Sequence, residues 1–248
     1  MSKLRFSLMT LNLWNTEFWE RRESTVRELL STFDPDICCF QEVRPSTMAL
    51  LDRWLPEHQR IRDPFPGWES EGNLFFRKEL FSLKEYGALD PRMPETERRL
   101  FWARLTVAGT DRTLFVSTIH LTHQGNADEL ETGCSHRHRE ALYLAEHLPE
   151  ILKEGEPGII AGDFNDPLHP SRILTGAGFT EVFNSLGMIS PVTFPSQPAT
   201  DELWMTEAID RIMASGPLRP LLASVPRFYA HGTSSSDHWP VVAVYEIR

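Results

Sequence analysis

The chain has 248 residues, of which 41% are hydrophobic and 24% charged, and this balance argues against a disordered protein because it provides for a packed core. A formal net charge of −10 argues against a surface that binds long stretches of nucleic-acid backbone, although a local basic groove is compatible with it. Three cysteines form no disulfide framework, and the short amino-terminal apolar stretch, interrupted by Asn12, Asn15 and Glu17, predicts neither a signal segment nor a membrane span, so we expect a cytoplasmic protein.

Hydrophobic periodicity predicts strands interspersed with helices along the chain. Short apolar runs that end at polar or turn residues predict strands, and apolar residues at helical spacing predict helices. In chain order, the predicted elements are a strand over 5–13, a helix over 20–33, a strand over 36–43, a helix over 45–54, strands over 72–77, 99–107 and 113–121, a helix that reaches residue 152, and strands over 158–162, 208–214 and 239–246.

The order of these elements favours an α/β protein with mixed sheets and helices outside them. A polar, glycine-containing loop over 121–135 is long enough to suggest a lid or a binding role. No internal repeat or linker-like composition interrupts the chain, so we expect a single domain over 1–248.

Polar residues recur at the ends of the predicted strands, and this recurrence is the main functional signal. Strand ends at one edge of a sheet converge in space, so carboxylates, amides and imidazoles placed there can form one pocket. In order, these residues are Asn12, Gln41-Glu42, Gly72-Asn73, His120, Asp163 to Asn165, Asp210 and Asp237-His238.

The donor types in this set predict a site for a hard cation. Glu, Asp and Asn without a pair of Cys or His ligands suit Mg²⁺ or Mn²⁺ rather than structural zinc. Since Mg²⁺ takes only one or two carboxylates and keeps several waters, Glu42 with help from Asn12 would suffice.

The remaining residues predict acid–base and charge-stabilising roles. We expect His238 to act as general base, with Asp210 fixing its tautomer. His120 and Asn165 could hydrogen-bond the phosphoryl oxygens, and Asp163 could position the attacking water.

Each residue also has a plainer interpretation when it is taken alone. Asn12 could be a turn residue, Glu42 a solvated residue before a helix, and Gly162 to Asn165 an ordinary Asx turn. His120 and His238 are two of nine histidines. Coincidence explains one such cluster well, but it poorly explains six clusters in this order with Asp210 as a seventh position.

Seven segments, in order, resemble the motifs of the endonuclease/exonuclease/phosphatase superfamily, and they span nearly the whole chain. The Gln-Glu, Gly-Asp-x-Asn and Ser-Asp-His motifs are the distinctive ones. The segments are Thr10-Leu11-Asn12-Leu13-Trp14-Asn15, Phe40-Gln41-Glu42-Val43, Gly72-Asn73, Ser117-Thr118-Ile119-His120-Leu121, Gly162-Asp163-Phe164-Asn165, Ile209-Asp210-Arg211 and Ser236-Asp237-His238-Trp239-Pro240.

This resemblance implies a DNase-I-like four-layer α/β sandwich, with two mixed sheets packed face to face, helices outside and a pocket at one edge. It also implies a role for each motif residue. By resemblance, Glu42 is the principal metal ligand, Asn12 and Asp237 support the metal, Asp163 and Asn165 handle water and phosphate, Asp210 pairs with His238, and His120 contacts the scissile phosphate.

Within the superfamily, the segment from Ser236 to Trp239 and the context of His120 are similar to the 5′-tyrosyl-DNA phosphodiesterases, which release protein adducts from DNA ends. Those enzymes carry Arg-x-x-Gln at the start of the helix after the long loop. This chain has Arg-x-x-Glu there, from Arg137 to Glu140, which puts substrate contacts in doubt.

The resemblance therefore implies a monomeric, Mg²⁺- or Mn²⁺-dependent phosphodiesterase of nuclease type that attacks its substrate in line with water. Nucleic-acid 5′ ends, protein–DNA adducts or nucleotides are the expected partners. A sphingomyelin-type head group and an inositol phosphate stay open, because the predicted groups touch only the phosphate. Aromatic residues such as Trp14, Phe18, Trp19 and Trp68 could stack on bases, contact acyl chains or pack in the core.

Two alternatives from other classes also stay open. One is a catalytically silent binding module of the same fold, which should have lost a central group. The other is a metal-independent esterase with Ser236 as nucleophile, but neighbouring residues on an extended chain point opposite ways, so Ser236, Asp237 and His238 cannot relay protons among themselves.

Overall fold

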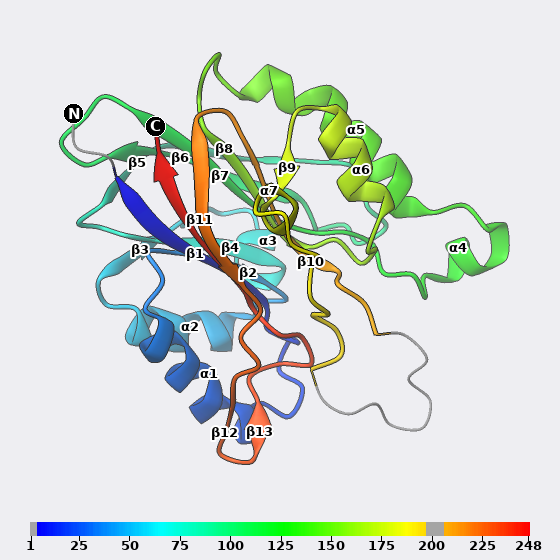
Figure 1. The fold of residues 1–248 in the computed structure, drawn as a ribbon. Coiled ribbons are helices and arrows are strands. Elements are labelled where there is room, and N and C mark those ends of the chain that lie inside the picture. Colours follow the sequence, from blue (N-terminus) through cyan, green and yellow to red (C-terminus); the bar gives the residue numbers. More distant parts are fainter. Residues whose placement is uncertain (1–3, 197–205) are drawn as a thin grey trace.

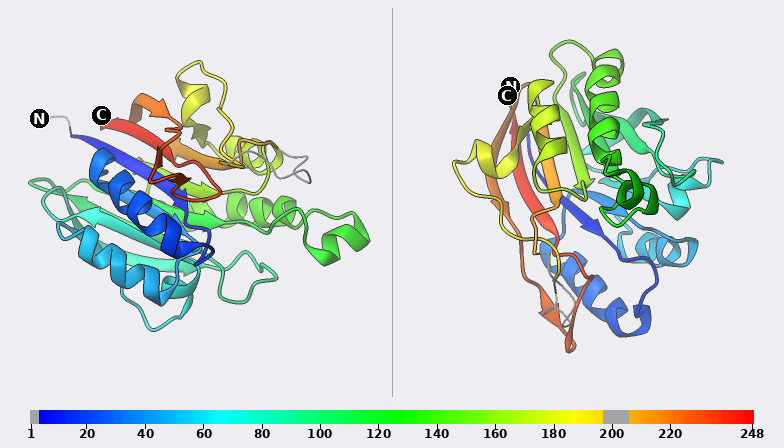
Figure 2. Two further views of the ribbon diagram at one scale, coloured as in Figure 1. Left: turned by 90° about the horizontal axis from the view of Figure 1, so that it is seen from below. Right: turned by 90° about the vertical axis from the view of Figure 1, so that its right-hand side faces the viewer.

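The computed structural model describes residues 4–196 and 206–248. In that part, two six-stranded sheets pack face to face with helices on their outer faces, which confirms the expected four-layer α/β sandwich (Figures 1 and 2). The first sheet has the order β11 (Leu218–Ser224), β14 (Val241–Ile247), β1 (Arg5–Asn12), β2 (Ile37–Gln41), β4 (Gly72–Arg77) and β3 (His58–Arg60).

The second sheet is also mixed. Each sheet contains one parallel pair, β1 with β2 and β7 with β8, and the other strand pairs of residues 4–196 and 206–248 in these sheets are antiparallel. The order is β5 (Phe81–Leu89), β6 (Leu100–Val107), β7 (Thr113–His120), β8 (Gly158–Asp163), β10 (Asp210–Ser215) and β9 (Thr180–Glu181), and β12 (Tyr229–Ala230) pairs with β13 (Thr233–Ser234) as a separate small ribbon.

The helices cover the outer faces of the two sheets. Two of them, α1 and α2, lie across the first sheet, while α5 and α6 lie against the second (Figures 1 and 2). The helices are α1 (Trp19–Phe33), α2 (Pro45–Trp54), α3 (Gly67–Ser70), α4 (Ala127–Thr132), α5 (His136–Ile151), α6 (His169–Gly176) and α7 (Val182–Ser185).

Alternation along the strands builds the layers. On β1, Phe6 and Leu8 lie in the core between the sheets, whereas Met9 and Leu11 pack against the helices outside. Successive side chains of a strand point to opposite faces, so one hydrophobic strand serves two cores. All four side chains are essentially buried.

The same alternation places the polar strand ends at one edge of the core between the sheets. Asn12 pairs in register with Gln41 at the ends of β1 and β2, and His120 pairs with Asp163 at the ends of β7 and β8. Asp210, at the start of the antiparallel strand β10, lies opposite Asp163. Each of the five is an even number of residues from an inward-facing core residue of its strand, so all five face inward.

Gln41 joins the two sheets next to this edge. Its Nε2 donates to Thr10 Oγ1 at 3.0 Å in the same sheet and to Thr118 Oγ1 at 2.7 Å in the opposite one. All three residues are fully buried. Because a buried amide is stable only when its hydrogen bonds are made, this link fixes the position of one sheet relative to the other.

Several elements differ from the sequence-based prediction. Strand β5 was not predicted because it is an edge strand in which exposed residues, Lys84 among them, alternate with less exposed ones, which weakens the hydrophobic signal. Strand β11 contains Pro220, which argues against a strand but is tolerated here at an edge, beside a bulge. The predicted loop over 121–135 contains the short helix α4, none of whose residues is buried.

Candidate functional site

Three predicted residues converge on one carboxylate oxygen of Asp163. Asn12 Nδ2 donates to Asp163 Oδ2 at 3.0 Å, His120 Nε2 lies 3.4 Å from that oxygen, and His238 Nε2 lies 3.7 Å from it. Asn12 Nδ2 also donates to Glu42 Oε1 at 3.1 Å. Residues from both sheets thus meet in a single cluster, as the strand-end argument predicted.

His238 lies between two buried aspartates. Its Nδ1 donates to Asp210 Oδ2 at 2.8 Å, while its Nε2 faces Asp163. The backbone N–H of Asp210 donates to Thr193 Oγ1 at 3.1 Å, and the Phe194 ring packs against the imidazole at 4.8 Å between centroids. The Asp210 contact therefore fixes the ring orientation and places the second nitrogen toward Asp163.

Burial and neighbouring charges shift the pKa values of this cluster in different directions. Burial would lower the pKa of His238, but Asp210, Asp163 and Asp237 outweigh it and raise that pKa well above its usual value. Burial raises the pKa of Asp163 to about 7, helped by Asp210 and opposed by His238. Burial lowers the pKa of His120 well below its usual value, so that imidazole is neutral at pH 7.

Glu42 and Asp237 are the carboxylates of the cluster that reach solvent. Their side chains are 25% and 26% exposed, whereas those of Asp163 and Asp210 are 1% exposed. Burial raises the pKa of Asp237, and the negative charge of Glu42 raises it further. A second carboxylate close enough to raise the pKa of Asp237, at an open position lined by oxygen atoms, fits a hard divalent cation.

Glu42 also has an unusual backbone. Its φ is +52°, a left-handed conformation that costs a non-glycine residue on the order of 1 kcal/mol or more. This turn directly follows Gln41, the last residue of β2, which is held in the core. It directs the Glu42 carboxylate toward Asn12, and the strain is consistent with a position selected for its side chain.

Asn12 supports the carboxylates through its nitrogen. Its Nδ2 donates to Glu42 and Asp163, and its Oδ1 accepts from the backbone N–H of Trp14 at 2.9 Å. The amide orientation follows from this hydrogen-bond network. Asn12 therefore orients the Glu42 carboxylate.

A second grouping of metal-ligand types has a different character. One ligand atom each of Asp163, Asp210 and His238 lies within 4.8 Å of the others, and all three residues are buried. Asp210 already occupies Nδ1 of the imidazole, however, so a cation would have to break that buried hydrogen bond. We interpret these three residues as a hydrogen-bonded proton relay and place the candidate metal site at Glu42 and Asp237.

The Gly-Asp-x-Asn segment is both an Asx turn and part of the site. The N–H of Asn165 donates to Asp163 Oδ1 at 2.8 Å, and Asn165 Nδ2 donates to Leu121 O at 2.8 Å. Gly162 has a φ of +147°, and a Cβ there would lie 1.9 Å from the carbonyl oxygen of Ile119. Glycine thus lets β8 approach β7 closely enough to bring Asp163 beside His120.

Two polar positions highlighted by the sequence have structural roles instead. Asn73 donates to Ile61 O and Trp68 O and accepts from the N–H groups of Ile61 and Leu74, so its side chain is used in holding loops together. Ser236 is fully buried, donates to Asp237 and accepts from the N–H of His238. It is therefore neither exposed nor aligned as a nucleophile.

The Arg-x-x-Glu segment at the start of α5 also points inward. Glu140 accepts from both the hydroxyl and the N–H of Thr122, and Arg137 donates to Thr122 O at 2.9 Å and pairs with Glu129. Both residues are buried. They hold the chain two residues beyond His120 and so fix the loop that leaves β7.

Sequence reasoning missed Arg22, which is 1% exposed. It donates to Leu13 O at 3.0 Å and Ser235 O at 2.6 Å, and also to the carbonyls of Glu17 and Trp14. Burial lowers its pKa to about 10, opposed by Asp237 and Glu42. The available signal was its place on the buried face of α1, four residues before Val26.

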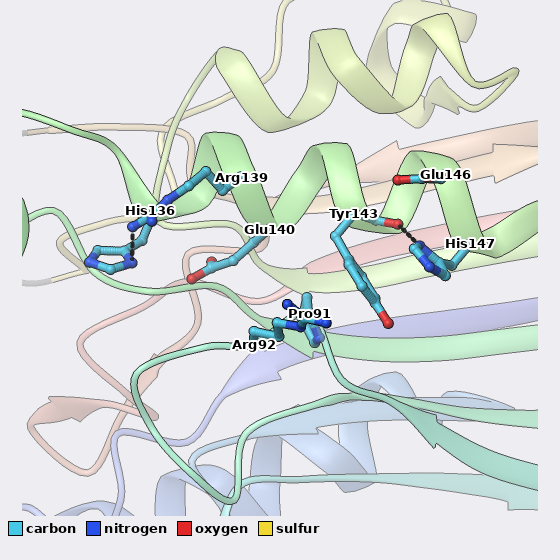
Figure 3. Close-up of a pocket in the computed structure, with 8 residues that line it drawn as sticks. All are labelled: Pro91, Arg92, His136, Arg139, Glu140, Tyr143, Glu146 and His147. Atoms are coloured by element: carbon cyan, nitrogen blue, oxygen red, sulfur yellow. Dashed lines mark hydrogen bonds between the residues drawn. The ribbon is translucent and has the colours of Figure 1, made fainter.

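A separate cavity of about 510 Å³ lies along α5 and is lined by none of the predicted site residues (Figure 3). Pro91 and Arg92 face the helix across it. Two of its residues contact each other: His147 Nδ1 lies 2.9 Å from the backbone carbonyl oxygen of Tyr143, and the two rings stack with their centroids 3.9 Å apart. We therefore keep the candidate site at the strand ends.

Comparisons with known proteins agree with this fold. A model of the Endonuclease/Exonuclease/phosphatase family matches residues 9–238. The uncharacterized protein YbhP of Escherichia coli (strain K12) is 25% identical over 88% of this chain and 86% of its own length. D. rerio TDP2 complexed with a single-strand DNA product superposes with a TM-score of 0.79 at 20% identity, covering 97% of this chain and 98% of that one.

The mannosyl-6-phosphatase Bt3783 of Bacteroides thetaiotaomicron VPI-5482 superposes with a TM-score of 0.75 at 18% identity and covers 97% of this chain and 99% of that one. At these identities the two structures establish the shared fold. None of the helices in residues 4–196 and 206–248 combines the length and the apolarity needed to cross a bilayer.

Proposed function

Because the chain belongs to the Endonuclease/Exonuclease/phosphatase family, we propose that it hydrolyses a phosphodiester bond with water and a divalent cation. The observation that carries this proposal is His238 held between Asp210 and Asp163, beside the two solvent-accessible carboxylates of Glu42 and Asp237. This arrangement offers groups that exchange protons next to a position for a hard cation.

Asp163 is the group best suited to accept the proton of the attacking water. Its pKa of about 7 lets it be ionised and still basic near neutral pH, which is the condition for an efficient general base. The sequence-based hypothesis gave that role to His238. The raised pKa of His238 instead makes its side chain a charged imidazolium at pH 7. In that state His238 is suited to donate a hydrogen bond to a phosphoryl oxygen and to exchange a proton with Asp163.

His120 and Asn165 are suited to bind phosphoryl oxygens. His120 is neutral, and its Nε2 faces the cluster, 4.0 Å from Glu42 Oε1 and 3.4 Å from Asp163 Oδ2. Asn165 uses one amide N–H on Leu121 O, which leaves the other available. Neutral donors stabilise charge on the phosphate without opposing the cation nearby.

Glu42 and Asp237 are the residues that would hold Mg²⁺ or Mn²⁺, with Asn12 orienting Glu42. When bound, such an ion offsets negative charge on the phosphate and on the leaving oxygen. Arg22 lies close enough to both carboxylates for its positive charge to interact with them electrostatically.

Two neighbours suggest different substrates. D. rerio TDP2 was solved with a single-strand DNA product, which supports a nucleic-acid end as the substrate here. The mannosyl-6-phosphatase supports a phosphomonoester as the second candidate. The groups of this chain that face the phosphate are compatible with both.

The test of the reaction is hydrolysis of bis-p-nitrophenyl phosphate with Mg²⁺ or Mn²⁺, with chelator and with metal added back. Asp163→Asn should lower kcat by about 10²- to 10⁴-fold, because the proton acceptor is lost while the shape is kept. The matched control, Asp111→Asn at an exposed turn, should keep full activity. Since Asp163 must lose its proton to act, wild-type activity should rise as the pH increases through its pKa.

Three outcomes would contradict the proposal: activity that survives the chelator, full activity of a folded Asp163→Asn variant, or no hydrolysis of any ester. The last outcome would favour a silent binding module. A panel of 5′-tyrosyl DNA, single-stranded DNA, sphingomyelin, inositol phosphates and mannose 6-phosphate then separates the substrate classes.

A further inference from the structure

A cavity of about 410 Å³ lies beside the candidate site, and two segments that lead into the site form its walls. Trp14, Phe18, Arg21 and Arg22 line one side, and residues 231–233 of the β12–β13 ribbon line the other. The N–H of Trp14 donates to Asn12 Oδ1 at 2.9 Å, and the ribbon runs directly into the Ser-Asp-His segment. This volume falls within the range of small-molecule sites, roughly 300–1,000 Å³.

The walls of this cavity are held in place. Arg22 donates to the carbonyl of Trp14, which lines one wall, and to the carbonyl of Ser235, two residues beyond the segment that lines the other. The ribbon is tied to α1 by His231, whose Nε2 lies 2.7 Å from Glu28 Oε2, and by the hydroxyl of Thr25, which donates to Ala230 O. The cavity is therefore a built feature of the fold, fixed relative to Asn12 and Asp237.

The lining combines aromatic rings with a solvent-exposed cation. The rings of Trp14 and Phe18 lie 5.4 Å apart between centroids, and Phe18 is 57% exposed. Arg21, also exposed, has its guanidinium 5.9 Å from the Phe18 ring centroid. The other aromatics named by the sequence differ: Trp68 is buried in the core, and Trp19 stacks on Trp54 at 6.3 Å.

The backbone under these rings is strained. Trp14 and Phe18 have φ values of +53° and +49°, and Asn15 between them has +50°. Bulky aromatic residues rarely adopt this left-handed conformation, which costs on the order of 1 kcal/mol or more at each position. Residues kept at such a cost next to a candidate active site point to a role for the two rings themselves.

We propose that the Trp14–Phe18–Arg21 cavity binds a nucleobase of the substrate next to the scissile phosphate, and this inference rests on the proposed phosphodiesterase function. The exposed face of Phe18 offers a stacking surface to a flat ring, and Arg21 offers a charge for a backbone phosphate. The same cavity disfavours an acyl chain, because a lipid tail there would desolvate the exposed Arg21 without pairing it.

The test compares two diesters that share a leaving group and differ only in the base. These are thymidine 5′-(p-nitrophenyl phosphate) and methyl p-nitrophenyl phosphate. For the wild type, kcat/KM should be higher for the thymidine diester. In Phe18→Ala, the ratio of the two kcat/KM values should fall by about 5- to 100-fold, as expected for the loss of one stacked base. The control Leu222→Ala, an exposed apolar residue on the edge strand β11, should keep the wild-type ratio.

A binding measurement keeps this inference separate from the proposed reaction. In chelator, the dinucleotide TpT should bind the wild type more tightly than an abasic analogue, and Phe18→Ala should remove the difference. If the protein hydrolyses no ester but still binds TpT more tightly than the abasic analogue, the proposed reaction is refuted and the nucleobase site is supported. Four results would each overturn the nucleobase assignment. In Phe18→Ala, these are an unchanged ratio of the two kcat/KM values, equal losses of activity on both diesters, or a loss of sphingomyelin cleavage alone. In the wild type, it is equal binding of TpT and its abasic analogue.

Discussion

Replacement of Arg22 by Met should destabilise the protein strongly, because Arg22 joins the loop that follows β1 to the loop that precedes β14. Its two buried hydrogen bonds go to Leu13 O and Ser235 O, while those to Glu17 O and Trp14 O are only partly buried. In Arg22→Met, water can reach the partly buried carbonyls, but the buried pair loses its donor.

The expected magnitude follows from these two bonds. Each hydrogen bond from a charged donor contributes about 1.5–3 kcal/mol, so the buried pair contributes roughly 3–6 kcal/mol. Relief of the cost of burying the charge, which lowers the pKa of Arg22 to about 10, offsets part of this. We expect a net loss of about 3 kcal/mol, which for a chain of this length lowers Tm by roughly 6–12 °C.

Arg21→Met is the matched control, because the same substitution one residue earlier removes an exposed arginine. Thermal unfolding followed by circular dichroism, together with urea midpoints, gives both values. If the Tm values of the two variants lie within about 2 °C of each other, the reasoning about buried carbonyls is refuted.

Two further predictions concern the backbone and the pH dependence of stability. Gly162→Ala should lower the free energy of unfolding, measured by urea denaturation, by more than about 3 kcal/mol, because the new Cβ would meet the carbonyl oxygen of Ile119. Gly133→Ala is the control, since open space surrounds that position, and it should lower the free energy of unfolding by about 1 kcal/mol. Equal losses in the two variants would contradict the argument. Burial lowers the pKa of His58 in the folded protein below its ordinary value of 6.5. As the pH falls below 6.5, His58 therefore takes up a proton more readily in the unfolded chain than in the folded one, and the free energy of unfolding decreases. The urea midpoints of wild type and His58→Gln should therefore converge between about pH 7.5 and 5.5, and a constant gap would contradict this assignment.

The sequence predicted those parts of the fold whose hydrophobic pattern is strong. The strands ending at Asn12, Gln41 and His120 are buried on both faces, so their apolar runs were continuous and their ends visible. The edge strands β5 and β11 were not predicted, because each has an exposed face and carries charged residues or a proline. Their pairing depends on neighbours distant in sequence.

The site was predictable where a residue type and a strand end coincide. The meeting of Asn12, His120 and Asp163 follows from strands that end at one edge, and His238 joins them because the antiparallel strand β14 begins at that edge. The order of their pKa values could not be predicted in this way, because it depends on burial and on distances that no motif encodes. For the same reason, our proposal that Asp163 rather than His238 accepts the proton rests on the three-dimensional arrangement and not on the motifs.

The cluster takes one part from each sheet, with Asn12 and Glu42 on one side and His120, Asp163 and Asp210 on the other. Strands can stay paired within each sheet while the two sheets shift against each other. The hydrogen bonds from Gln41 to Thr118 and from Asn12 to Asp163 both cross between the sheets and resist such a shift. Turnover is therefore a sensitive reporter of the alignment between the layers. On warming, we expect activity to decline before far-ultraviolet circular dichroism records any loss of strands.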